Sequence, residues 1–187
     1  ILLFYSSCTS NQNEIVINGY TMGTTYSITI ANFKEQEDSF KNQIDSLLSI
    51  VNKHFSTYLN DSEISNINTQ NSNLFTLSNE FLHVLKKALH YCRISGGNYD
   101  ITIAPLVDLW GFGPSGTMKV PNKKNIQNVL ESIGYQKIIL KDNVLLNKNK
   151  VKIDLNSIAK GYGVDRVSEY ILEKGYSDFL VEIGGEI

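Results

Sequence analysis

Cysteine is scarce in this sequence, and its scarcity excludes two kinds of protein. Only Cys8 and Cys92 occur among 187 residues. With Cys8 assigned to the terminal segment discussed below, Cys92 has no partner, so neither a disulfide framework nor a cysteine metal site can be built. Cys92 lies in a helical pattern, FLHVLKKALHYC, and we expect it to be a core residue.

An excess of basic residues is also lacking. The formal net charge is −2 and the isoelectric point is about 5.9, so no basic surface is available to neutralise a nucleic-acid backbone. The three histidines form no HExxH motif, and no Ser-His-Asp arrangement can be argued. No run of about 20 apolar residues is long enough to span a membrane. The hydrophobic content of 42% is instead typical of one globular domain.

The first 14 residues, ILLFYSSCTSNQNE, are typical of the end of a bacterial lipoprotein signal followed by a polar tether. Cys8 would carry the lipid, which places the protein in the bacterial cell envelope, anchored to the inner membrane on its extracytoplasmic or periplasmic side. A frayed apolar terminus is the alternative interpretation. The sequence starts with Ile1 and stops within VEIGGEI, so we expect an internal piece of a longer protein, with 15–187 as the N-terminal portion of a single domain.

Hydrophobic periodicity predicts an α+β fold with a mainly antiparallel sheet packed against helices. The expected helices span 40–55, 78–92, 123–133 and 157–174. The expected strands are 14–20, 24–30, 136–141, 143–147, 151–155 and 178–184. Because short turns join the three strands between 136 and 155, we expect them to form an antiparallel meander.

The stretch VKIDLNSIAKGYGVDR, residues 151–166, joins a predicted strand to a predicted helix. The free N–H groups and positive pole of a helix start can bind phosphate, and Lys160 would add a full positive charge. Asp154 could accept a hydrogen bond from a base or ribose, and a backbone carbonyl near Ser157 could meet a metal. An ordinary ion pair between Asp154 and Lys160 at the surface fits the residues equally well.

Residues 96–116 hold five of the thirteen glycines, two of the three prolines and the only tryptophan. Glycine lets backbone approach a ligand closely, and Tyr99, Trp110 and Phe112 offer planar surfaces for a flat aromatic ligand. A packed irregular loop with a buried tryptophan is the alternative. Met22, in YTMGTTYS, has a polarizable side chain able to lie on a ring, and Tyr58 follows the first helix.

In their order along the chain, MGTTYSI, FSTYLNDSEISNIN, SGGNYDITIAPLVDLWGFG, VKIDLNSIAKGYGVDRV and FLVEIGGEI resemble the ApbE family. Members of that family are FAD:protein FMN transferases, formerly described as thiamine biosynthesis lipoproteins. The resemblance implies an ApbE-like flavin transferase fold whose C-terminal part is missing here. It also implies an enzyme that takes FAD and Mg²⁺, moves FMN onto a threonine or serine of an acceptor flavoprotein such as a membrane redox pump subunit, and releases AMP.

The resemblance also assigns roles to individual residues of this sequence. Contacts to the flavin nucleotide fall on the following residues: Met22, Tyr58, Asn98, Tyr99, Asp100, Asp154 and Lys160. The metal contact falls on the backbone carbonyl of Ser157, where relatives often have alanine, and Asn98 stands where small residues are common. Catalytic residues are expected beyond Ile187, so this fragment alone is predicted to be inactive. An FAD pyrophosphatase that gives FMN and AMP, and a non-catalytic flavin-binding lipoprotein or solute-binding module, are alternatives.

Overall fold

The computed structural model describes residues 13–114, 116, 120–147 and 149–187. Cys8 and nearly all of the proposed lipoprotein segment lie outside the described residues. The helices are α1 (Glu37–Phe55), α2 (Glu63–Thr69), α3 (Asn79–Ile94), α4 (Ala104–Leu109), α5 (Lys123–Leu130), the short 3₁₀ helix η1 (Tyr135–Lys137) and α6 (Asn156–Glu173). The strands are β1 (Ile15–Thr21), β2 (Thr24–Ile30), β3 (Leu74–Thr76), β4 (Ile139–Lys141), β5 (Val144–Leu146) and β6 (Phe179–Ile183).

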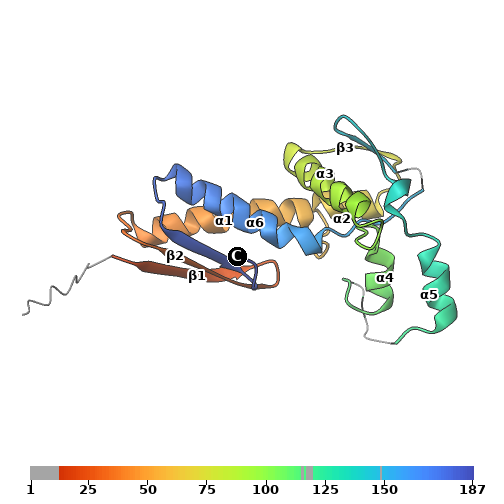
Figure 1. Cartoon of the computed structure of the whole chain (residues 1–187), viewed down its shortest axis with the longest axis horizontal. Coiled ribbons are helices and arrows are strands. Elements are labelled where there is room, and N and C mark those ends of the chain that lie inside the picture. Colours follow the sequence, from red (N-terminus) through yellow and green to blue (C-terminus); the bar gives the residue numbers. More distant parts are fainter. Residues whose placement is uncertain (1–12, 115, 117–119, 148) are drawn as a thin grey trace, which may run out of the picture.

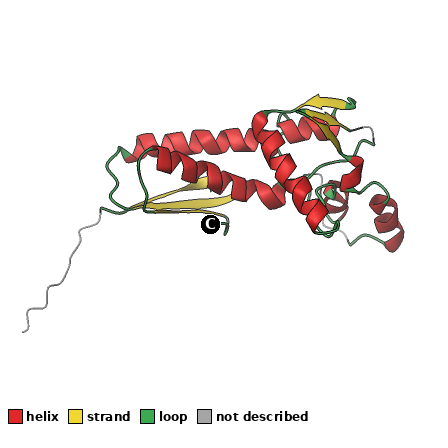
Figure 2. Ribbon diagram, turned by 45° about the horizontal axis from the view of Figure 1, so that its top comes forward, coloured by secondary structure: helices red, strands yellow, loops and turns green. Residues whose placement is uncertain are grey.

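Two antiparallel sheets lie at opposite ends of an elongated molecule. The larger sheet has the order β1-β2-β6, and the smaller sheet has the order β3-β5-β4. The long helices α1 and α6 run side by side along the larger sheet (Figure 1). Figure 2 shows the same two helices reaching from the sheet into the cluster of shorter helices. The predicted α+β class with mainly antiparallel pairing is confirmed.

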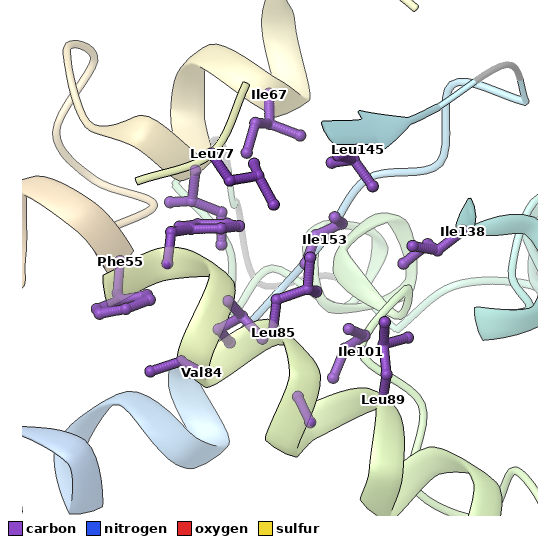
Figure 3. Packing of buried hydrophobic residues seen from close by; sticks show 14 of the residues in the cluster. Phe55, Ile67, Leu77, Val84, Leu85, Leu89, Ile101, Ile138, Leu145 and Ile153 are labelled. Carbon is purple, nitrogen blue, oxygen red and sulfur yellow. The ribbon is translucent and has the colours of Figure 1, made fainter. Parts of the chain in front are cut away.

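The buried side chains form two hydrophobic clusters, and α1 and α6 contribute to both. Phe40, Ile44 and Leu48 of α1 pack with the inner faces of β1, β2 and β6. Val51 and Phe55, one to two turns further along α1, belong to the second cluster around α3. Figure 3 shows this second cluster, in which the following residues are labelled: Phe55, Ile67, Leu77, Val84, Leu85, Leu89, Ile101, Ile138, Leu145 and Ile153. The apolar period of α1 therefore ties the two ends of the molecule together.

Several predicted elements occur where the sequence placed them. The helix predicted at 157–174 is α6, and Gly175 follows it with φ of +87°, a conformation that favours glycine at a helix end. Ser78 caps α3 by accepting a hydrogen bond from the Phe81 N–H at 3.1 Å. Cys92 is fully buried in the second cluster, as predicted. The helix predicted at 123–133 ends earlier, at Leu130.

The prediction of a third meander strand at 151–155 was wrong. Residues 151–155 belong to no strand. The side chain of Asn68 instead binds their backbone, since it donates to the Ile153 carbonyl and accepts from the Ile153 N–H. The Asp154 N–H donates to the Ile101 carbonyl at 2.7 Å. The strand β5 pairs with β4, as predicted, and on its other side with β3, a three-residue strand that the sequence analysis did not identify. Alternation of apolar and polar residues indicates which side chains are buried, but it does not indicate which group forms hydrogen bonds with the backbone.

A half-buried cluster of hydrogen-bonded side chains joins the ends of three helices. The Glu63 carboxylate of α2 accepts hydrogen bonds from the N–H and the hydroxyl of Ser78, at 2.8 and 2.6 Å. His54 Nδ1, near the end of α1, lies 2.8 Å from the same carboxylate. Burial opposes ionisation of Glu63, but the hydrogen bonds from His54 and Ser78 outweigh it and lower the pKa of the carboxyl.

Gly19 of β1 is required by the side chain of Tyr26, its cross-strand neighbour on β2. A Cβ at position 19 would lie 2.4 Å from the Tyr26 ring. The ring cannot move aside easily, because its hydroxyl donates to Asp45 at 2.6 Å and accepts from Lys41 at 3.0 Å. An aromatic side chain thus covers a glycine of the edge strand and connects the sheet to α1.

We predict that Gly19→Ala destabilises the full-length protein by about 1–3 kcal/mol, because it overpacks a buried contact. Gly161, inside α6, has no atom within 4 Å of the Cβ position. Gly161→Ala is therefore the matched control, and it should stabilise by about 0.5–1 kcal/mol through helix propensity. Urea unfolding followed by circular dichroism measures both changes. Equal free energies of unfolding for the two variants would contradict this account of Gly19.

Candidate functional site

A large cavity lies between the β1–β2 hairpin, α1 and the first turns of α6. It has a volume of about 1070 Å³, and we call it the main cavity. Three of the predicted site residues line it, namely Met22, Tyr58 and Lys160. Segments far apart in the sequence therefore meet at one place.

Met22 occupies a strained backbone position at the tip of the hairpin. Thr21 and Thr24 pair across a two-residue turn in which Met22 has φ of +50° and Gly23 has φ of +72°. Positive φ at both turn positions matches the right-handed twist of a hairpin, but a long side chain rarely adopts it. The side chain reaches toward α6, where its Cε lies 3.0 Å from the Cβ position of Gly163. Strain of this kind is typical of positions held for a function.

Tyr58 stands just beyond the C-terminus of α1 with 65% of its surface exposed. Its hydroxyl donates to the Phe112 carbonyl at 3.1 Å and so connects the end of α1 to the segment after α4. Phe112 is 62% exposed and Trp110 is 38% exposed. The interpretation of residues 96–116 as a loop around a buried tryptophan was therefore wrong. Part of the loop is helical, as α4, and its aromatic rings are open to solvent.

Lys160 does not pair with Asp154, so the alternative of a simple ion pair between these two residues was wrong. The Lys160 ammonium lies 2.8 Å from Glu186 Oε2, beyond the end of β6. Asp154 instead holds the start of α6: its carboxylate accepts from the Asn156 N–H at 2.7 Å and from the Asn156 amide at 3.3 Å. Lys160 and Asp154 thus bind different neighbours, Glu186 and Asn156, near the start of α6.

Asp154 lines a second cavity of about 430 Å³, together with Lys152 and Asp108. Burial raises the pKa of Asp154, the hydrogen bonds from Asn156 partly offset it, and the nearby charge of Asp108 raises it further. Asn156 lines both this second cavity and the main cavity. The sequence analysis did not single out Asn156, although its position two residues after Asp154 on a helix start was the available signal.

The segment GGNYD lies beside this junction but lines neither cavity. The Tyr99 hydroxyl is 3.1 Å from Ser157 Oγ, so these two predicted residues do meet. The Asn98 side chain donates to the Ser95 carbonyl at 2.8 Å. Asp100 accepts from the Thr102 N–H and hydroxyl and from the Tyr135 N–H, at 2.8, 2.6 and 2.9 Å. Its carboxylate is therefore engaged in holding this segment in place.

The described residues contain no group of three side chains suited to hold a metal ion. Within the same residues, no helix combines the length and the apolar character needed to cross a membrane.

Comparison with known proteins supplies the decisive observation. The ApbE family profile matches residues 22–187. The chain belongs to the ApbE family. It is 37% identical over 191 residues to an FAD:protein FMN transferase of Vibrio cholerae and 37% identical over 201 residues to that of Haemophilus influenzae. These alignments cover 100% and 99% of this chain but 57% of each relative, so the chain spans little more than half of their length.

Solved structures agree with this family assignment. The flavin transferase ApbE from Vibrio cholerae superposes with a TM-score of 0.89 at 35% identity, over 93% of this chain and 58% of that one. The apo form of the Pseudomonas stutzeri flavinyl transferase ApbE gives 0.86 at 28% identity, over 93% and 60%. The predicted ApbE-like fold is therefore confirmed.

We predict that Asp154→Asn leaves the ApbE chain at least as stable as the wild type at pH 7. A carboxyl whose folded pKa is raised costs stability at any pH above that value, and asparagine removes this cost while still accepting the Asn156 N–H. Urea unfolding at pH 4 and pH 7 measures the effect, with Asp165→Asn, an exposed change on α6, as the control. A large loss of stability at pH 7 would make Asp154 a structural turn residue.

Proposed function

We propose that the full-length protein is an FAD:protein FMN transferase and that this chain forms most of its FAD-binding part. The observation that carries the proposal is the convergence of Met22, Tyr58 and Lys160 on one cavity of about 1070 Å³, adjoined at Asn156 by the cavity that Asp154 lines. Two cavities that share the lining residue Asn156 suit an elongated dinucleotide. The relatives from Vibrio cholerae and Haemophilus influenzae, which are FAD:protein FMN transferases, support the same substrate.

Each residue has a role that follows from its surroundings. Tyr58 and Met22 offer a ring and a thioether to the flat, apolar parts of FAD. Lys160 supplies positive charge near the start of α6, where the positive pole of the helix also favours phosphate. Asp154 accepts hydrogen bonds from the base or ribose. Tyr99 and Ser157 meet beside the junction of Asp154 with α6, and hydrogen bonds of Asn98 and Asp100 hold this segment in place.

The reaction is a phosphoryl transfer that balances without an oxidant. A threonine or serine hydroxyl of the acceptor attacks the FMN-side phosphorus, a new P–O bond forms, the P–O bond to AMP breaks, and AMP leaves. The hydroxyl proton must pass to a base, for which we propose a residue outside this chain. The residues here contribute binding, orientation and charge, which are the main terms in this class of reaction.

Mg²⁺ is part of the proposal, but the described residues do not form a site for it alone. The Ser157 carbonyl offers one oxygen, whereas Mg²⁺ requires six ligands in near-octahedral geometry. The chemistry that the metal supplies is neutralisation of charge on the phosphates. We propose that its remaining ligands, and the catalytic base, come from the part of the relatives that this chain does not span.

We further propose that Cys8 carries a lipid that holds the enzyme at the extracytoplasmic side of the inner membrane, near acceptors such as a membrane redox pump subunit. The support is the apolar run, the small residues and the cysteine of ILLFYSSC, with residues 9–14 as the tether of a single-domain enzyme. Fractionation of the full-length protein with membranes should depend on Cys8, and a Cys8→Ser protein that stays with the membrane would contradict the anchor.

The proposed function is tested by incubating the full-length protein with FAD, Mg²⁺ and an acceptor domain. Covalent flavin fluorescence on the acceptor together with released AMP is the expected result. Free FMN and AMP would show a pyrophosphatase, and unchanged FAD that is bound but not cleaved would show a flavin-binding lipoprotein. Residues 1–187 alone should transfer no flavin, since the proposed base and metal ligands are absent.

We predict that Tyr58→Ala weakens FAD binding about two- to tenfold, since an aromatic contact contributes about 0.5–1.5 kcal/mol. Tyr58→Phe keeps the ring and loses only the hydrogen bond to Phe112, so its affinity should stay close to that of the wild type. Tyr91→Ala removes a ring that is 50% exposed on α3 and lines neither the main cavity nor the second one, and it serves as control. Calorimetric titration of full-length protein with FAD measures all three. Equal losses at Tyr58 and Tyr91 would remove Tyr58 from the site.

A further inference from the structure

Lys160 has an ion-pair partner that lies outside the wall of the main cavity. Its ammonium is 2.8 Å from Glu186 Oε2, and the two side chains are 33% and 43% exposed. Lys160 lines the cavity, whereas Glu186 does not. Among the described residues, Glu186 is the acidic side chain that pairs with Lys160. The positive charge offered to an anionic ligand is therefore already shared with a carboxylate of the same chain.

A tight turn fixes the backbone that carries Glu186. Gly184 and Gly185 have φ of +58° and +95°, and the Ile183 N–H donates to the Glu186 carbonyl at 2.9 Å. The Gly184 N–H donates to the Thr25 carbonyl at 3.0 Å, which ties the turn to the β1–β2 hairpin. A Cβ at Gly184 would lie 2.7 Å from the Thr24 side chain, so the packing is close. The carboxylate is thus brought to Lys160 by the sheet.

The contact between the two charges is one that a ligand can exchange. The ammonium and carboxylate are close, but they lack the alignment of a hydrogen bond, and Glu186 Oε2, a buried atom in a side chain that is 43% exposed, has no hydrogen-bond donor. Partly exposed ion pairs contribute little, about 0.2–1 kcal/mol. A phosphate group accepts well-aligned, charge-assisted hydrogen bonds, which are stronger. An anion that enters the cavity can therefore take over the ammonium.

We propose that Glu186 competes with the phosphates of the ligand for Lys160 and so lowers the affinity of the main cavity for anions. Glu186 is a positioning residue that acts through Lys160 and does not itself need to touch the ligand. The inference rests on the proposed function for the identity of the natural ligand, a nucleoside diphosphate ester. The competition itself requires only an anion that reaches Lys160.

The test is a double-mutant cycle in the full-length protein, with binding of inorganic pyrophosphate and of FAD measured by calorimetry at fixed ionic strength. Glu186→Gln keeps the shape of the side chain and removes its charge. It should tighten binding of both probes about two- to fivefold, the range that the loss of a partly exposed ion pair allows. A merely structural residue would weaken binding when changed. In the Lys160→Gln background, Glu186→Gln should have no effect.

Glu169→Gln is the matched control, because Glu169 lies on α6, is ion-paired to Arg166 and lines neither cavity. It should leave binding unchanged, which excludes a general effect of net charge. Thermal unfolding of each variant by circular dichroism establishes that it is folded. Weaker or unchanged binding in Glu186→Gln, or an equal gain in the Lys160→Gln background, overturns the inference, as does the absence of pyrophosphate binding in all forms.

The two proposals fail in different ways. A protein that binds pyrophosphate with the expected dependence on Glu186 but does not bind FAD keeps this inference and loses the proposed function. A protein that transfers FMN from FAD but shows no effect of Glu186→Gln keeps the proposed function and loses this inference.

Discussion

The packing of α1 against α6 is the constraint on which the rest of the structure depends. Each helix places one part of its apolar face in the cluster under the larger sheet and the other part in the cluster around α3. Gly163 lets the side chains of Met22 and Ile183 approach α6 closely. Because the main cavity is bounded by these two helices and the hairpin, the same packing that joins the hydrophobic clusters also sets the width of the site.

The main cavity is lined by different kinds of local structure, and each of them supplies a different chemical group. A strained hairpin supplies a thioether, a helix exit supplies an exposed ring, and a helix start supplies N–H groups and a lysine. The hydrogen bond between Asp154 and Asn156 holds the start of α6, and Asp100 holds the GGNYD segment beside it. Most of the polar groups near the cavities are therefore bound to the protein before any ligand arrives, which reduces the cost of ordering them.

Periodicity predicted the long helices and the hairpin because their apolar faces are broad and uninterrupted. Periodicity predicted a strand at 151–155, but the backbone there binds the Asn68 side chain instead of a neighbouring strand. It also missed β3, because a strand of three residues is too short to show a period. The order of the sequence motifs pointed to Met22, Tyr58 and Lys160 as site residues, and these three residues line one cavity. The order of the motifs could not show that Lys160 pairs with Glu186, or that the Asp100 carboxylate accepts hydrogen bonds from Thr102 and Tyr135. Such contacts depend on turns that join distant segments.

The lowered pKa of Glu63 gives the junction of α1, α2 and α3 a measure of acid tolerance. A carboxyl with a depressed folded pKa contributes stability that is fully present above its unfolded value, about 4.3, and is lost only as the pH falls through the lower folded value. The Ser78 cap that begins α3 therefore keeps its charged acceptor in mildly acidic surroundings. The hydrogen bonds that join α1, α2 and α3 therefore persist at a pH at which an unperturbed glutamate would already be protonated.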